Sequence, residues 1–128
     1  MPVLVDTSIW VDYLRSGNFA ETLDFFIDEN LIVTNDLILA ELVPFLRVRK
    51  QKKLISLLRN IKRLDLFIDW NQIIDYQYKC LKNGINAVGI PDLIIAQNAI
   101  QNDCEIFSQD NHFFLMKDIL NLNILRKK

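Results

Sequence analysis

The stretch Met1-Pro-Val-Leu-Val-Asp-Thr-Ser8 sets the expected fold of the whole chain. Val3 to Val5 is a short aliphatic and β-branched run, which predicts one buried strand. The run ends in Asp6, and an apolar helical pattern begins at Ile9. In an open α/β sheet, ligands bind outside the carboxyl ends of the strands, which is where Asp6 would lie. The structural alternative is that Asp6 or Thr7 only caps the following helix.

The composition is that of an ordinary globular protein, and we expect one domain over residues 1–128. A chain of this length can bury a hydrophobic core large enough to be stable without disulfides or a structural metal. Because the sequence has only three glycines and three prolines, helix should dominate. A net charge of −1 argues against nucleic-acid binding by bulk charge alone, but not against a local basic face.

Neither a membrane span nor a secretory signal is expected. No apolar stretch reaches the roughly 18 residues of a membrane helix, and Asp6 and Asp12 interrupt the apolar N-terminus. Cys80 and Cys104 fall on separate patterns without metal-type spacing. We therefore expect a cytoplasmic protein whose cysteines are reduced and buried.

Beyond Ile9, helical patterns alternate with short apolar runs, which predicts an α/β fold. Further strands are expected at residues 31–33, 64–68, 105–107 and 122–125. Helices are expected at residues 9–15, 19–30, 37–46, 54–61, 70–83, 93–103 and from 111 onward. Asn18 with Glu21 should form a capping box, and Asp69 with Gln72 marks another helix start.

The helix expected at residues 37–46 is almost wholly apolar, with Glu41 as its only charge. A helix that is apolar on all sides is buried, and a buried carboxylate is costly unless it is paired or bound to a metal. Glu41 is therefore a candidate functional residue. The structural alternative is a salt bridge to a basic residue further along the chain. Pro44 should kink the same helix.

A basic segment follows this helix, from Arg47 to Lys53, and Arg59, Lys62 and Arg63 continue it. Such runs usually form a solvated face. The alternative is a surface that contacts phosphates beside the acidic site.

Two further acids occupy positions comparable to that of Asp6. Asp92 follows Pro91 at a helix start, where both residue types are favoured for structural reasons. Alanines on the same helical face permit close packing on the sheet, which draws Asp92 toward the sheet edge. Asp110 follows the strand expected at residues 105–107, as Asp6 follows the first strand. The acids that can converge are Asp6, Glu41, Asp92 and Asp110.

A cluster of four carboxylates favours Mg²⁺ or Mn²⁺ held with several waters, because these ions prefer oxygen ligands. No cysteine or histidine cluster lies nearby in the sequence, which disfavours zinc. At a phosphodiester, such ions activate a water nucleophile and neutralise charge on the phosphate oxygens. Without a cation, the carboxylates would raise one another's pKa values.

Four motifs, in their order and spacing, resemble PIN-domain ribonucleases, and most closely the VapC-type toxins of toxin–antitoxin pairs. They are Val-Asp6-Thr-Ser8-Ile-Trp, the isolated Glu41, Pro-Asp92-Leu-Ile-Ile-Ala96 and Phe-Ser108-Gln-Asp110-Asn-His-Phe113. The resemblance covers essentially the whole chain and implies a PIN-like three-layer α/β/α sandwich with a mainly parallel central sheet. It also implies a metal-dependent endoribonuclease that cleaves RNA. The implied metal-binding and catalytic acids are Asp6, Glu41, Asp92 and Asp110.

The resemblance extends to neighbouring residues. Ser8 matches a hydroxyl position that supports the first aspartate, and Ser108 stands where relatives often have threonine. His112, the sole histidine, is interpreted as a surface or substrate-side residue and not as a general base. Gln97 and Asn98 replace two small residues that many relatives have, which we interpret as a change on the helix surface.

The resemblance also implies protein partners. These toxins typically form homodimers, and a small antitoxin occupies the active-site groove. Apolar surface on the helix that carries Phe25 and Phe26, or around Pro44, is the expected place for it. Transfer, ribosomal and messenger RNA are all open as targets.

Other interpretations are weighed against this one. A haloacid-dehalogenase-type phosphatase also has an aspartate after its first strand, but it needs a second aspartate where this chain has Ser8. A phospho-receiver domain needs paired acids there and a late lysine. A PIN-like module that holds RNA or protein without cutting stays open, although none of the four acids is missing. A PIN nuclease that processes RNA without an antitoxin also stays open.

Overall fold

The computed structural model describes residues 1–125 and contains one sheet of five parallel strands. The strand order is β3-β2-β1-β4-β5, so β1 lies at the centre with β2 and β4 as its neighbours. The strands are β1 (Val3–Val5), β2 (Ile32–Asn35), β3 (Lys62–Leu64), β4 (Glu105–Phe107) and β5 (Asn123–Ile124).

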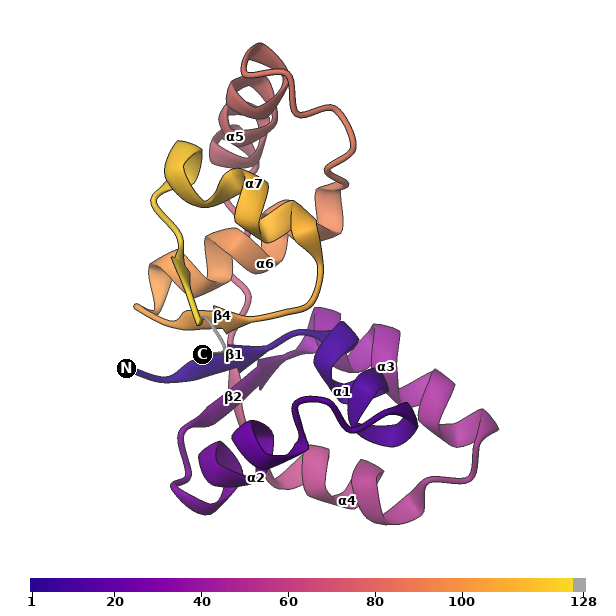
Figure 1. Cartoon of the computed structure of the whole chain (residues 1–128). Helices are drawn as coiled ribbons and strands as arrows, with labels where there is room; N and C mark the ends of the chain where they lie inside the picture. Colours follow the sequence, from indigo (N-terminus) through magenta and orange to yellow (C-terminus); the bar gives the residue numbers. More distant parts are fainter. Residues whose placement is uncertain (126–128) are drawn as a thin grey trace.

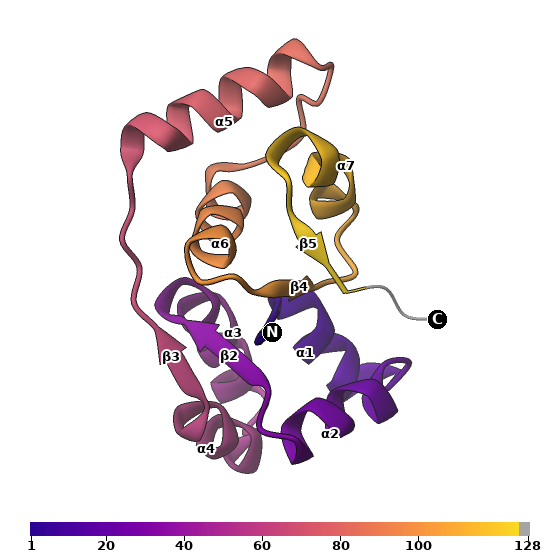
Figure 2. The ribbon, with the colours of Figure 1, turned by 90° about the vertical axis from the view of Figure 1, so that its left-hand side faces the viewer.

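Helices cover both faces of the sheet and give three layers, which confirms the predicted α/β/α class (Figures 1 and 2). One layer holds α1 (Thr7–Arg15), α2 (Ala20–Asp28), α3 (Asp36–Val48) and α4 (Lys52–Asn60). The other layer holds α5 (Trp70–Lys82), α6 (Ile90–Gln101) and α7 (Asn111–Leu120). Within residues 1–125, no helix combines the length and the apolar character that a membrane crossing requires. Cys80 and Cys104 are buried and unpaired, as predicted.

Side chains alternate across β1 and divide the core into two parts. Val3 and Val5 belong to one cluster with Trp10 and Phe107, on the side of α1–α4. Leu4 belongs to the other cluster, on the side of α5–α7. Because both faces of β1 are buried, its sequence is a continuous aliphatic run and does not alternate with polar residues.

The order of the strands reverses at β1, which makes the gap between β1 and β4 a topological switch point. From β1 the chain proceeds outward to β2 and β3, then crosses to β4 and proceeds outward to β5. Ligands bind outside the carboxyl ends of the strands at such a point. Here the Asp6 amide donates to the Phe107 carbonyl at 2.9 Å. The fold thus brings together the residues that follow β1 and β4.

The third strand lies earlier than the predicted range of residues 64–68. β3 ends at Leu64, and residues 65–69 lie outside the sheet. The carbonyls of Asp65 and Phe67 accept hydrogen bonds from side chains of α6, at 3.0 and 2.9 Å. These bonds replace the ladder that a longer strand would have formed.

Gln97 and Asn98 of α6 hold this connection in place. Gln97 accepts from the Asp69 amide at 3.2 Å and donates to the Asp69 carbonyl at 3.1 Å. Asn98 donates to the Asp65 carbonyl and accepts from the Asn35 side chain at 2.9 Å. Both side chains are only 1% exposed, so the interpretation that they alter the helix surface is wrong.

The predicted capping box at the start of α2 is also wrong. The helix begins at Ala20 and has no side-chain cap. Asn18 instead donates to one carboxylate oxygen of Asp12, and the Phe19 amide donates to the other, both at 3.2 Å. A buried carboxylate from α1 therefore organises this turn, which the local pattern of Asn18 and Glu21 does not reveal.

Candidate active site

Asp6 lies at the carboxyl end of β1 and is only 7% exposed. It occupies the N-cap position of α1, but its side chain makes no capping hydrogen bond. Its Oδ2 atom instead accepts from the Ser8 hydroxyl at 3.0 Å and from the Ser108 hydroxyl at 2.8 Å. The simple helix cap is thus excluded as the purpose of this carboxylate.

The two serines connect the segments that follow β1 and β4. Their Oγ atoms are 3.2 Å apart. Ser8 Oγ accepts from the Gln109 amide at 3.0 Å, and Ser108 Oγ accepts from the Asp110 amide at 2.9 Å. Each hydroxyl has one proton, so both are satisfied when both donate to Asp6. The predicted supporting positions are therefore occupied by hydroxyls that fix the orientation of the Asp6 carboxylate.

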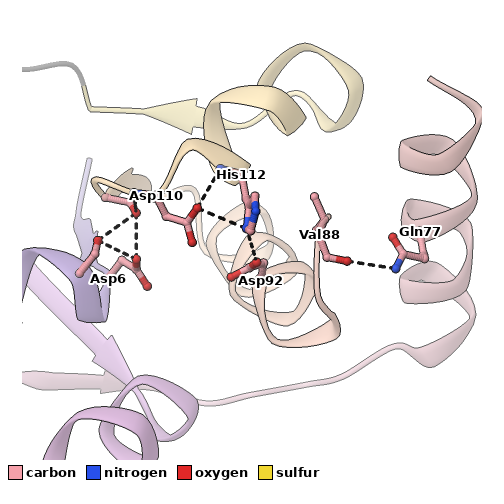
Figure 3. Close-up of polar contacts among 8 residues, drawn as sticks. Asp6, Gln77, Val88, Asp92, Asp110 and His112 are labelled. Atoms are coloured by element: carbon pink, nitrogen blue, oxygen red, sulfur yellow. Dashed lines mark hydrogen bonds and ion pairs between the residues drawn. The ribbon is translucent and has the colours of Figure 1, made fainter. Parts of the chain in front are cut away.

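Asp92 and Asp110 come together around His112 (Figure 3). His112 Nδ1 lies 3.0 Å from Asp92 Oδ2 and 3.3 Å from Asp110 Oδ1. Asp110 is the N-cap of α7 and also accepts from the His112 amide at 2.9 Å. Asp92 lies in the first turn of α6.

Of the two places that the sequence left open for His112, the surface or the substrate side, this arrangement favours the second. The side chain is 32% exposed and contacts two of the four acids, so it belongs to the acidic cluster and not to the open surface. The available signal was the spacing Asp110-Asn-His112, which places an imidazole in the first turn after a capping carboxylate. Contact with Asp92 depends on the fold, because it joins residues 20 positions apart.

Glu41 is exposed on α3, so the expectation of a buried carboxylate is wrong. The helix turns Ile38, Leu42 and Leu46 into the core and leaves Glu41 on a different side. The Thr7 hydroxyl donates to Glu41 Oε1 at 3.3 Å, which places this carboxylate beside the start of α1. In the described part of the chain, Glu41 forms no ion pair with a basic side chain, contrary to the structural alternative.

The four acids influence one another electrostatically. Burial raises the pKa of Asp92, and the charges of Asp110 and Asp6 raise it further, against the opposing effect of the His112 hydrogen bond. Loss of hydration also raises the pKa of Glu41, and Asp6 and Asp92 act in the same direction, against the Thr7 hydrogen bond. Glu41 therefore belongs electrostatically to the same cluster despite its exposed position. The fold collects negative charge that a cation would neutralise.

The donor atoms at this edge fit a divalent metal ion. One ligand atom each from Asp92, Asp110 and His112 lie within 4.8 Å of one another. Carboxylate oxygens suit Mg²⁺ and Mn²⁺, whereas an imidazole nitrogen suits Mn²⁺ and later transition metals better than Mg²⁺. These three ligand atoms include the imidazole nitrogen of His112, so they differ from the all-oxygen cluster expected from the sequence.

Comparison with known proteins agrees with the fold and the motifs. The PIN domain family matches residues 3–118, and the chain therefore belongs to this family. Similar solved structures include VapBC2 from Rickettsia felis bound to a DNA fragment from their promoter, with a TM-score of 0.77, 21% identity and all of both chains covered.

Two other solved structures are similar over nearly their whole length. FitAcB from Neisseria gonorrhoeae has a TM-score of 0.68 and 19% identity, with 97% of this chain and 96% of that chain covered. DNA-bound VapBC from Salmonella typhimurium has a TM-score of 0.69 and 16% identity, with 98% and 97% covered. These likenesses concern the fold. No curated protein sequence matches the chain.

Proposed function

We propose that the protein is a metal-dependent endoribonuclease and the toxin of a toxin–antitoxin pair. The observation that supports this most is the gathering of Asp6, Glu41, Asp92 and Asp110 at the switch point of a PIN domain. On this proposal, residues 1–128 form a single PIN domain. The free, buried cysteines suit a reducing cytoplasm.

The four acids are the proposed ligands of Mg²⁺ or Mn²⁺, and His112 lies within reach of the same site. When bound, such an ion activates water and offsets the charge that develops on a phosphodiester. Ser8 and Ser108 hold Asp6 in one orientation before any ion arrives. The Asp110 carboxylate accepts from the His112 amide, and the Asp110 backbone amide donates to the Ser108 hydroxyl. This preorganisation limits the structural change that binding requires.

Cleavage of total cellular RNA tests the proposal. Purified protein with Mn²⁺ or Mg²⁺ should release discrete fragments, and EDTA or Asp6→Asn should abolish them. Asp118→Asn, which removes an exposed carboxylate from α7, is the matched control and should cut normally. Metal binding without cleavage by the folded wild-type protein would favour a PIN module that binds RNA without cutting it. A failure to bind any metal would contradict the proposal.

An antitoxin is the proposed protein partner, and α2 is the proposed docking surface. Phe25 is 55% exposed there, whereas Phe26 packs against Phe107 with ring centroids 6.3 Å apart. On α3, next to Pro44 in the sequence, the Phe45 ring lies beneath the Arg49 guanidinium, whose Cζ atom is 3.7 Å from the ring centroid. Alanine at Phe25, Phe26 or Phe45 should weaken capture of a small antitoxin encoded beside this gene. Unchanged affinity in all three folded variants would contradict the placement.

A second copy of the chain is the other proposed partner, and α5 offers a surface for it. Four of its large side chains are more than half exposed and share one helical face: Trp70, Ile74, Tyr78 and Leu81. Together they expose about 400 Å², at about half of roughly 200 Å² each, whereas a standard interface takes about 800 Å² per partner. The stripe thus supplies about half of a dimer interface.

The charges of α5 favour a two-fold arrangement. Asp69 caps its N-terminus, and Lys79 and Lys82 lie in its last turn, so antiparallel packing of two copies places opposite charges together. Ile74→Asp should produce a monomer in sedimentation experiments. Leu115→Asp, at a residue of α7 that is 45% exposed, is the control and should leave the mass unchanged. A dimer that survives Ile74→Asp would exclude this face.

A further inference from the structure

A cavity of about 320 Å³ lies on the α3–α4 layer, and none of the four acids of the candidate active site lines it. Arg47 of α3, Arg59 of α4 and Arg63 of β3 line it. Three different elements thus contribute an arginine to the wall of one cavity. The apolar part of the wall consists of Leu39, Ala40, Val43 and Pro44.

The charge in this cavity is only partly neutralised. Arg63 forms an ion pair with Asp36 at 3.1 Å, and both side chains are about half exposed or more. Arg47 and Arg59 form no ion pair within residues 1–125. Three cations and one acid therefore leave an excess of two positive charges, although the chain as a whole has a net charge of −1. The attraction for an anion is local.

The cavity and the acidic cluster share α3. Ala40 lines the cavity, and the next residue is Glu41, which contacts Thr7 at the start of α1. Arg47 follows Glu41 by six residues, or about 9 Å along the helix axis. At the stacked duplex spacing of about 3.4 Å per nucleotide, one strand covers this axial separation in roughly three nucleotides, and an extended single strand needs fewer. An extended polyanion at the acids therefore reaches the arginines across the exposed side of α3.

We propose that Arg47, Arg59 and Arg63 form a subsite for the phosphate backbone of single-stranded RNA, next to the site of cleavage. This inference rests on the proposed function and names the surface that holds its substrate. When no cation is bound, the four carboxylates repel a phosphodiester, so attraction in that state has to come from outside the cluster. Guanidinium forks match phosphate oxygens, and the apolar wall offers contact to a ribose or base. Continuity with Glu41 favours RNA over an acidic peptide.

Binding of a fluorescent single-stranded RNA in EDTA tests the subsite without catalysis. The double variant Arg47→Ala/Arg59→Ala changes two exposed residues and should fold. It should bind RNA at least about tenfold more weakly. Two lost phosphate contacts should also lower the slope of log affinity against log salt by about 1.4, since each contact contributes about 0.7 on single strands.

Two further variants make the result specific. Lys117→Ala removes a cation from α7, on the other layer, and should bind nearly as the wild type does. Asp36→Ala releases Arg63 from its ion pair and should tighten binding. If Arg47→Ala or Arg59→Ala alone loses no more affinity than Lys117→Ala, or if the wild-type protein does not bind RNA, the subsite is refuted.

Cleavage assays separate this inference from the proposed function. If the protein has the proposed nuclease activity, Arg47→Ala/Arg59→Ala should raise KM and leave kcat nearly unchanged. RNA that binds through the arginines but is never cut supports the subsite and contradicts the nuclease. Normal cleavage with an unchanged KM contradicts the subsite and supports the nuclease. A variant that loses binding only to an acidic peptide assigns the cavity to a protein partner and overturns the inference.

Discussion

Replacement of Ser108 by alanine should weaken metal binding by 10- to 100-fold. Ser108 is 6% exposed, and its hydroxyl donates to Asp6 at 2.8 Å while it accepts from the Asp110 amide at 2.9 Å. A hydrogen bond to a charged group contributes about 1.5–3 kcal/mol. Loss of a group that orients a metal ligand typically costs about 10- to 100-fold in affinity, or about 1.4–2.8 kcal/mol. The two ranges agree, and Ser8 still holds Asp6 at 3.0 Å, so binding is weakened and not abolished.

Isothermal titration with Mn²⁺ near neutral pH measures this effect directly. Ser108→Thr keeps the hydroxyl and should retain most of the affinity. Ser56→Ala, on the exposed side of α4, removes a serine far from the acids and should have no effect. If Ser108→Ala binds Mn²⁺ with the wild-type affinity, the hydroxyl does not position a metal ligand, and the argument from the serine pair fails.

Three further predictions concern the acids and the core. Without metal, Asp92→Asn should raise the melting temperature, because the raised pKa of Asp92 means that its negative charge destabilises the folded state. With Mn²⁺, the same variant should lose the increase in melting temperature that the metal gives the wild-type protein. Apparent Mn²⁺ affinity should fall with decreasing pH through the raised pKa values of Asp92 and Glu41, since protons then displace the metal; an unchanged affinity down to pH 4 would contradict this. Phe107→Ala, at a side chain 2% exposed, should lower the free energy of unfolding by about 3–5 kcal/mol in urea titrations, whereas Phe67→Ala, at a side chain 73% exposed, should have little effect.

The sequence predicted those parts of the fold that depend on neighbouring residues. β1 and β4 have the predicted bounds, because each is a short apolar run that ends in polar residues. The start of α5 is also as predicted, since Asp69 accepts from the Gln72 amide within a single turn. The aspartates that follow β1 and β4 could be placed at one edge because a parallel sheet aligns its carboxyl ends.

The predictions from the sequence that proved wrong involve contacts between distant parts of the chain. The segment after Leu64 has strand-like residues, but side chains 33 and 34 positions later bind its carbonyls and keep it out of the sheet. The exposure of Glu41 depends on which side of α3 the sheet and α4 cover, and an apolar sequence does not reveal this. His112 joined the acidic cluster only because α6 and α7 place Asp92 beside it.

The hydrogen bond between Ser108 and Asp6 also has a consequence for the time at which the site can form. It joins residues 102 positions apart, and the pairing of β1 with β4 spans a similar separation. Contacts of such high sequence separation form late in folding. The chain first loses the conformational entropy of closing a long loop, and only then does the contact stabilise it. A chain still emerging from the ribosome has Asp6 early but lacks this partner until Ser108 has been made. The site as described therefore cannot form before the segment that follows β4 has been synthesised, and a chain that ends before Ser108 lacks it.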